Sequence, residues 1–298
     1  MNEIKDFQLP LFGSPDTNQV VNVASVPQRS PFRYPGGKTW LVPIIRQWLV
    51  NSSRRPIEFI EPFAGGSIIG LTVAFENLAD HVTLVEIDPN VAAVWKTIIY
   101  GNYEKLAHRI LTFDLTPENV EIVLTNPAEN IEDKAFQTII KNRVNRGGIL
   151  APGAGRIKNG ENGKGIRSRW YPATLCRRIK DIGKIRNKFT FIEGDGIQIL
   201  KEKADQIDTC YFIDPPYTVD GKKAGARLYA HFNIDHELLF STVATLKGDF
   251  LMTYDNVLGV NNMADRCGFM TRLVAMKNTH NAEMSELLIG RDLFWLNN

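Results

Sequence analysis

An alternation of strand-like and helix-like segments restricts the fold of this 298-residue chain more than any other feature. In the helix-like segments apolar residues recur every three or four positions, whereas the strand-like ones are rich in β-branched and aromatic residues. Such repetition predicts an α/β fold with a mainly parallel sheet covered on both faces. The strand-like segments are residues 57–63, 82–88, 189–195, 209–216 and 248–256. The helix-like segments are residues 39–50, 90–100 and 235–246.

Two features divide the chain into parts. About one hundred residues separate the second strand-like segment from the third, far more than a single crossover needs. Near the end, segments 271–278 and 285–296 follow each other closely, as an antiparallel edge pair would. We therefore expect three parts, an N-terminal arm, a catalytic domain in two pieces, and an inserted target-recognition subdomain. Their expected bounds are 1–28 for the arm, 29–100 and 189–298 for the catalytic domain, and 101–188 for the insert.

The insert carries an excess of positive charge that the formal net charge of +2 conceals. From Lys141 to Lys188 there are 14 Lys or Arg residues against two acids, a formal charge of +12, which leaves 21 basic and 31 acidic residues elsewhere. Contacts to phosphates supply most sequence-independent affinity for nucleic acid, so this segment favours a polyanionic partner. A solvated basic surface without a partner is the alternative.

Composition narrows the class of protein further. The sequence has no apolar run long enough for a membrane span, and its start, MNEIKDFQLP, is unlike a signal peptide, so we expect a cytoplasmic protein. The three cysteines, Cys176, Cys210 and Cys267, are far apart and have no neighbouring ligands at metal-binding spacing. We expect reduced thiols and no metal.

The segment FIDPPYTVDG (212–221) ends an apolar strand at an acid, two prolines and an aromatic ring. The Asp214 carboxylate and the Pro215 carbonyl offer two acceptors, while the Pro215–Pro216 pair fixes φ and removes competing donors. An amino group held between two acceptors is favoured in its pyramidal form, with its lone pair free to attack a methyl group. Positive charge that develops on that nitrogen would lie beside Asp214. Tyr217 offers a face on which a base could stack.

Acids and glycines end the other strand-like segments. Glu61, Glu86 and Asp195 each follow a strand, and Gly65–Gly66 precedes a helix without the dinucleotide-binding spacing. In open parallel sheets these ends meet at one crevice, where carboxylates can accept hydrogen bonds from a ribose diol or an adenine amino group. Each acid alone is compatible with a helix cap; together they predict a nucleoside pocket. We expect the nearby Asp88 to cap a helix that begins at Pro89.

Motifs in a fixed order make the sequence resemble the Dam-like class of DNA adenine-N6 methyltransferases. The resemblance spans residues 31 to about 246, and the glycine motif in it is weak alone, whereas PFRYPGGK and DPPY in this order are specific. It implies S-adenosylmethionine as cofactor and a Rossmann-like methyltransferase sheet with an antiparallel C-terminal strand. The matching motifs are PFRYPGGK (31–38), FIEPFAGG (59–66), LVEIDPN (84–90), IIKNRVNRGG (139–148), FIDPPY (212–217) and LYAHFNIDHELL (228–239).

The resemblance and the strand-end acids together give the expected site. By resemblance the catalytic residues are Asp214, Pro215, Pro216 and Tyr217. The expected cofactor-binding residues are Tyr34, Pro35, Gly36, Gly37, Lys38, Glu61, Pro62, Phe63, Gly65, Gly66, Glu86, Ile87, Asp195 and Asp214. The expected DNA-binding residues are Lys38, Arg143, Asn145, Arg146, Arg156, Lys158, Arg167, Arg169, Tyr229 and Phe232. The insert departs most from better-known members, so only Arg143, Asn145 and Arg146 are suggested as base-reading residues.

The expected activity is site-specific methylation of N6 of an adenine flipped out of duplex DNA, since a stacked base hides its amino group. We expect a monomer acting on double-stranded DNA, compatible with a separate restriction endonuclease as partner. Two alternatives remain open. Paired acceptors would also suit methyl transfer to cytosine N4, RNA or a protein amide, and a DNA-binding relative without turnover could keep the same pocket.

Overall fold

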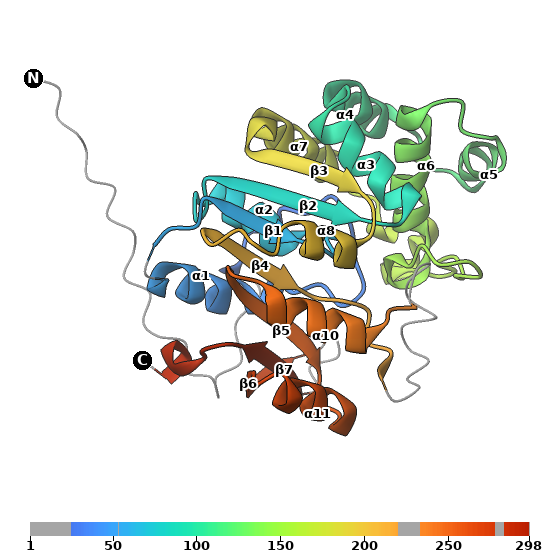
Figure 1. Cartoon of the computed structure of the whole chain (residues 1–298). Coiled ribbons are helices and arrows are strands. Elements are labelled where there is room, and N and C mark those ends of the chain that lie inside the picture. The colour runs from blue at the N-terminus through green and yellow to red at the C-terminus, as the bar shows by residue number, and fades with distance from the viewer. Residues whose placement is uncertain (1–24, 53, 220–232, 278–282, 298) are drawn as a thin grey trace, which may run out of the picture.

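The structure, a computed structural model, describes residues 25–52, 54–219, 233–277 and 283–297. Seven strands form one mixed sheet in the order β3-β2-β1-β4-β5-β7-β6 (Figure 1). The first five are mutually parallel where they pair, and β7 runs antiparallel to both of its neighbours. The strands are β1 (Glu58–Glu61), β2 (His81–Glu86), β3 (Phe189–Glu193), β4 (Thr209–Ile213), β5 (Asp249–Asp255), β6 (Met270–Lys277) and β7 (Glu283–Gly290).

Helices cover both faces of the sheet. On one face lie α1 (Val42–Asn51), α2 (Ile68–Phe75) and α3 (Pro89–Ile99), with α4 (Tyr103–Thr112), α5 (Pro117–Thr125), α6 (Ile131–Val144) and α7 (Pro172–Lys184) packed outside them. On the other face lie α8 (Gly196–Glu202), α10 (His236–Thr245) and α11 (Leu258–Arg266). Short 3₁₀ helices complete the fold: η2 (Thr39–Leu41), η3 (Arg146–Gly148), η4 (Glu161–Gly163), η5 (Gly165–Arg169), η6 (Arg186–Lys188) and η8 (Phe294–Asn297).

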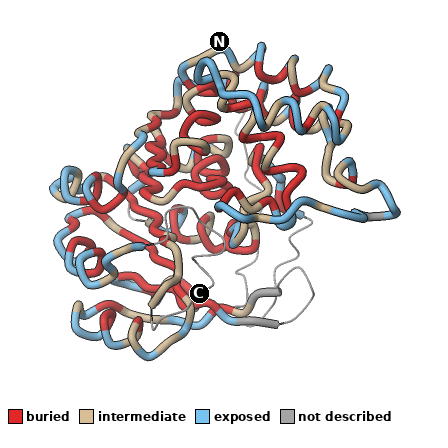
Figure 2. The backbone as a smooth tube through the Cα atoms, turned by 90° about the vertical axis from the view of Figure 1, so that its right-hand side faces the viewer, coloured by how far each residue is buried: buried red, intermediate tan, exposed pale blue. Residues whose placement is uncertain are grey.

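Strand residues alternate between two apolar cores, as the two-residue period of a strand requires. Phe59 and Phe212 point into the core shared with α1, α2 and α3, whereas Ile60 and Ile213 point into the core shared with α8, α10 and α11. Figure 2 shows the resulting pattern, in which buried segments run through the middle of the molecule and exposed ones lie outside. A sheet buried on both faces accounts for the near-continuous apolar runs of its strands.

The α/β fold expected from the sequence is confirmed, including the antiparallel pairing near the C-terminus. Each strand-like and helix-like segment that we singled out corresponds to an element of its type within a few residues. One expectation was too long: the strand expected over 285–296 ends at Gly290, and residues 294–297 form η8. Asp88 caps α3 as expected, since its Oδ1 accepts a hydrogen bond from the Asn90 N–H at 2.8 Å.

Residues 101–188 do not form a core of their own. Leu106, Phe136 and Ile179 belong to the same apolar cluster as Trp95 of α3. The helices of this segment therefore extend one core rather than build a second, and the division of the chain into domains stays a prediction. Within the described residues, no helix combines the length and apolar character needed to cross a membrane.

The packing of α7 against α4 can be tested at Gly183. A Cβ built on Gly183 would lie 2.5 Å from ring atoms of Tyr103, so Gly183→Ala should destabilise the protein by about 1–3 kcal/mol. Helix propensity alone would stabilise by up to about 1 kcal/mol. Urea unfolding measures the difference. In a Tyr103→Ala background the same change should be neutral or stabilising, and an equal loss in both backgrounds would contradict this packing.

Candidate functional site

A large cavity lies beyond the carboxyl ends of the parallel strands. The chain continues from β1 to β2 on one side, while β4 borders β1 on the other, and ligand crevices form at such switch points. The cavity measures about 1110 Å³, whereas one small ligand usually takes about 300–1,000 Å³. It therefore has room for a nucleoside and a second group beside it.

A tight turn places Lys38 at this cavity. The Gly37 N–H donates to the Tyr34 carbonyl at 3.2 Å, with Pro35 second and Gly36 third in the turn. Gly36 has a φ of +72°, the pattern of a type II turn, in which the third position favours glycine. The Lys38 ammonium then reaches back to donate to the Gly36 carbonyl at 3.0 Å. Lys38 is only 4% exposed, so its charge is held inside the site.

The glycine turn after β1 is fastened from several sides. The Gly65 N–H donates to Glu86 Oε2 at 2.8 Å, and the Gly65 carbonyl accepts from Trp95 Nε1 at 2.9 Å. Ser67 adopts a left-handed conformation with a φ of +47°, which a non-glycine residue takes up only where its surroundings enforce it. Tyr34 packs its ring on this turn, since a Cβ at Gly65 would lie 2.6 Å from it.

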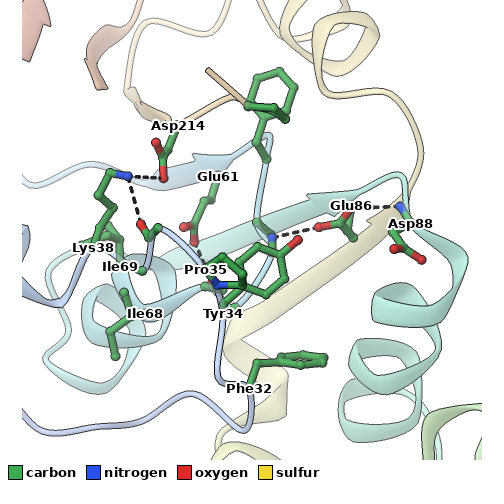
Figure 3. A pocket seen from close by; sticks show the side chains of 18 of the residues that line it. Phe32, Tyr34, Pro35, Lys38, Glu61, Ile68, Ile69, Glu86, Asp88 and Asp214 are labelled. Carbon is green, nitrogen blue, oxygen red and sulfur yellow. Dashed lines mark hydrogen bonds and ion pairs between the residues drawn. The ribbon is translucent and has the colours of Figure 1, made fainter. Parts of the chain in front are cut away.

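Two of the strand-end acids are buried and bonded within the protein (Figure 3). Glu61 accepts hydrogen bonds from Ser67 Oγ at 2.6 Å and from the Gly70 N–H at 3.0 Å. Glu86 accepts from the N–H groups of Gly65 and Asp88, one on each oxygen. Burial raises the pKa of Glu61 to about 8 and the pKa of Glu86 to about 7, and the hydrogen bonds only partly oppose this effect.

Asp214 is the centre of a hydrogen-bonded cluster just after β4. Its Oδ1 accepts from the hydroxyl groups of Tyr217 and Thr253, both at 2.8 Å, and its Oδ2 lies 3.0 Å from the Lys38 ammonium. The carboxylate is thus held in place by three donors from three parts of the chain. Figure 3 shows the Lys38 ammonium beside the Asp214 carboxylate, with Glu61 close by.

Tyr217 belongs to the wall behind Asp214. Its ring stacks on Tyr254 with centroids 5.5 Å apart, and the Lys38 ammonium lies 5.1 Å from its centroid. Burial is the largest cause that raises the pKa of Tyr217 well above its usual value, so the hydroxyl keeps its proton and donates to Asp214. In this arrangement the Tyr217 hydroxyl orients the Asp214 carboxylate. Tyr217 is not among the residues that line the cavity.

The structure brings the expected cofactor-binding residues together. All of them line the one cavity, with Asp195 exposed at its rim as the cap of α8. Of the expected catalytic loop, Asp214 and Pro216 line the cavity, while Pro215 is buried behind it. Tyr229 and Phe232 lie outside the described residues.

Two of the suggested base-reading residues are placed inside the protein. Arg143 and Asn145 are each 4% exposed. Arg143 donates to the Pro31 carbonyl, and Asn145 donates to the Ile149 carbonyl at 2.7 Å. Neither side chain is presented at the surface in this structure, and each bonds to backbone of the protein itself; base reading by these two residues stays a prediction.

Arg143 helps to hold the strap, residues 30–35, against the cavity, and two other residues of the insert do the same. Asn142 of α6 accepts from the Arg33 N–H and donates to the Arg33 carbonyl, each at 2.9 Å. Arg178 of α7 donates to the Ser30 carbonyl at 3.0 Å. The insert therefore fixes one wall of the cavity directly.

The remaining expected DNA-binding residues lie nearer the surface. Arg146, Arg156, Lys158 and Arg167 are exposed, and Arg169 is half-buried on the cavity wall. Arg156 pairs with Glu121 at 2.8 Å, and Arg167 pairs with Asp114 at 2.9 Å. Arg146 and Lys158 are thus the clearest exposed cations of this group.

Sequence reasoning missed two residues of the Asp214 cluster, Thr253 and Glu286. Thr253 is fully buried in β5, and Glu286 is 6% exposed in β7. Both are polar residues inside apolar strands, which is the available signal, since a buried polar side chain must find a partner. Among the described residues, no three His, Cys, Asp or Glu side chains gather as a metal site requires.

Comparison with known proteins identifies the family. Residues 34–274 match the family model of the D12 class N6 adenine-specific DNA methyltransferases. A search of curated proteins finds no match. Among solved structures, a candidate RNA methyltransferase of Pyrococcus horikoshii is 10% identical with a TM-score of 0.39, covering 90% of this chain and 92% of that one. That likeness is too weak to argue from.

A crevice lined by strand-end acids and by Asp214 and Pro216 of the DPPY loop is the kind of site expected of an amino-methyltransferase with a nucleoside cofactor. The chain belongs to the D12 class of N6 adenine-specific DNA methyltransferases. It uses S-adenosylmethionine to methylate N6 of adenine in DNA, which confirms the activity and the cofactor expected from the sequence. The alternatives of another amine substrate or a relative without activity are not favoured by this membership.

The buried state of Glu61 predicts a pH dependence of stability. With a pKa of about 8 when folded against 4.5 when unfolded, Glu61 keeps its proton in the folded state only, so stability falls as pH rises through this window. Without cofactor, Glu61→Gln should be less pH-dependent than wild type by about 2 kcal/mol between pH 6 and pH 8. Urea unfolding at both pH values measures this, and parallel profiles would contradict it.

Proposed function

We propose that Asp214 holds the target amine during methyl transfer, with the Pro215 carbonyl as the second acceptor. One observation carries the proposal: the Asp214 carboxylate lines the same cavity as Glu61, Glu86 and the Gly65–Gly66 turn. A carboxylate fixed by neighbouring donors needs little reorganisation when charge develops beside it. Asp214 meets this condition, since Tyr217 and Thr253 orient it from behind.

S-adenosylmethionine, when bound, supplies an electrophilic methyl group on a cationic sulfur. The adenine nitrogen must present its lone pair, which is otherwise delocalised into the ring. Acceptors at Asp214 and Pro215 would draw on both N–H groups and favour the pyramidal nitrogen. Transfer of the methyl group, with the electron pair of the broken C–S bond returning to sulfur, would leave positive charge on the nitrogen; Asp214 would stabilise this charge until the nitrogen releases a proton to solvent.

The chain's residues fit a nucleoside cofactor. Glu61 and Glu86 stand at adjacent strand ends, each with oxygens able to accept further hydrogen bonds beyond the backbone N–H groups they hold. We propose that Glu86 accepts from the ribose diol and that Asp195 accepts from the adenine amino group. Tyr34 and Ile87, from the motifs PFRYPGGK and LVEIDPN, line the cavity and offer apolar surface to the adenine of the cofactor.

We propose duplex DNA as the substrate form, with the target adenine flipped into the cavity and recognition at a specific site. Arg169 and Arg178 of the insert line the same cavity as Asp214, and cationic side chains at a cavity favour the approach of a phosphate backbone, which supports this proposal. We further propose that the chain acts as a monomer in the cytoplasm of a bacterial or phage-infected cell. A separate restriction endonuclease is the partner that such an activity would serve.

The role of Asp214 is tested by Asp214→Ala. Methyl transfer should fall by at least about 100-fold, because a preorganised acceptor is lost from the transition state. Affinity for S-adenosylmethionine, measured by calorimetry, should stay within a few fold. The matched control is Asp205→Ala, an exposed acid that pairs with Lys247 and lies before β4, away from the cavity. Retention of wild-type turnover by the Asp214 variant would reject the assigned mechanism.

The DNA surface is tested with the double variant Arg146→Ala/Lys158→Ala. Both side chains are exposed. If both contact phosphates, affinity for duplex DNA should fall, and the slope of log K against log salt should flatten by about 2. Fluorescence anisotropy across a salt series measures both effects. Lys247→Ala, which removes a cation just before β5 at the amino ends of the parallel strands, should leave the slope unchanged. An unchanged slope in the double variant would place DNA elsewhere.

A further inference from the structure

Glu286 is a buried acid next to the catalytic cluster that the family motifs do not include. It lies in β7 among apolar neighbours, paired in register opposite Asp255 of β5, and is 6% exposed. Because β7 runs antiparallel to β5, a residue near the start of β7 lies beside the carboxyl ends of β4 and β5. Glu286 thereby lines the same cavity as Asp214.

The two acids share the same partners. The Lys38 ammonium lies 3.0 Å from Asp214 Oδ2 and 3.6 Å from Glu286 Oε1. The Tyr217 hydroxyl lies 2.8 Å from Asp214 Oδ1 and 3.3 Å from Glu286 Oε2. Lys38 and Tyr217 thus lie between two carboxylates, closer to Asp214 in both cases.

This geometry sets a requirement on catalysis. Oδ1 of Asp214 already accepts from Tyr217 and Thr253, so Oδ2 is the oxygen that a target amine would use. The Lys38 ammonium lies 3.0 Å from Oδ2, so an amine that binds this oxygen would compete with the ammonium for it. A buried ammonium that leaves its carboxylate without another anion is strongly destabilised. Glu286 supplies that anion within one short movement of the Lys38 side chain.

We propose that Glu286 is a positioning residue for methyl transfer, which takes over the Lys38 ammonium when the target amine binds Asp214. The proposal rests on the role assigned to Asp214 above. In this state Glu286 keeps the charge of Lys38 compensated, and Asp214 is free to act on the amine. Glu286 does not touch the substrate in this scheme and acts only through Lys38 and Tyr217.

Because Glu286 must be ionised to hold Lys38, the proposal predicts a pH dependence of the methylation rate. The groups that face it are Lys38 from the segment before η2, Asp214 and Tyr217 from the loop after β4, and Asp255 from β5. Burial is the largest cause that raises its pKa to about 7, Lys38 opposes the shift, and the two aspartates add to it. Above pH 7 Glu286 is ionised and can hold Lys38, whereas below pH 7 it becomes neutral and cannot.

The decisive variant is Glu286→Gln, which keeps the side-chain length and the acceptor for Tyr217 but removes the charge. The single-turnover methylation rate at pH 8, with saturating cofactor and DNA, should fall by between about 10-fold and 100-fold. Affinity for S-adenosylmethionine, measured by calorimetry, should change by less than a few fold. The ratio of wild-type to variant rate should shrink towards one as pH falls below about 7. A purely structural role predicts a constant ratio.

Two further variants keep the test decisive. Glu286→Asp restores the charge and should recover part of the rate, which a loss of folding would not. In a Lys38→Met background, Glu286→Gln should lower the rate by less than about twofold, because no ammonium remains to be held. Glu237→Gln, an exposed acid on α10 paired with Arg266, is the control and should match wild type.

The outcomes separate this inference from the proposed function. Turnover by Asp214→Ala would overturn both. If Asp214→Ala is inactive while Glu286→Gln keeps the wild-type rate and pH profile, only the role of Glu286 is overturned. A rate loss in Glu286→Gln that is the same at every pH, or that Glu286→Asp does not relieve, would reduce Glu286 to a structural residue.

Discussion

Buried ionisable side chains at the carboxyl ends of the strands are the constraint on which the rest of this structure depends. Glu61, Glu86, Glu286 and Lys38 are all less than a tenth exposed, and an uncompensated buried ion costs several kcal/mol. Three of them bond to the surrounding backbone: Glu61 at the start of α2, Glu86 at the glycine turn, and Lys38 at the Gly36 carbonyl. The same hydrogen bonds that neutralise the cost of burial give the cavity its shape.

The insert takes part in that shape as well as in the expected binding of DNA. Asn142 and Arg178 reach from α6 and α7 to the backbone of the strap, and Ser30 of the strap donates to the Gly66 carbonyl at 2.5 Å. One continuous set of hydrogen bonds thus joins the helices of the insert to the glycine turn. These hydrogen bonds connect the helices of the insert directly to the wall of the cavity.

Local patterns account for what the sequence could predict. The strand periodicity, the Asp88–Pro89 cap and the YPGG turn each depend on neighbours in the chain, so their structures follow from a few letters. The strand-end acids were predictable because parallel strands bring their ends together. The burial of Arg143 was not predictable, because an arginine at the end of a helix is usually an exposed cation. Its hydrogen-bond acceptor is a backbone carbonyl 112 residues away in the sequence. Glu286 was hidden for the same reason, because the pairing of β7 with β5 is a tertiary property.

The antiparallel strand has a chemical consequence beyond closing the edge of the sheet. If β7 were parallel to β5, an acid near its start would lie at the amino ends of the strands, far from Asp214. Reversal of β7 brings Glu286 opposite Asp255 and within 3.6 Å of the Lys38 ammonium. One lysine then faces two carboxylates, so either acid can be relieved of it while the other remains paired. In the mechanism we propose, the target amine replaces Lys38 beside Asp214, and the direction of β7 supplies the second anion that can hold the displaced ammonium.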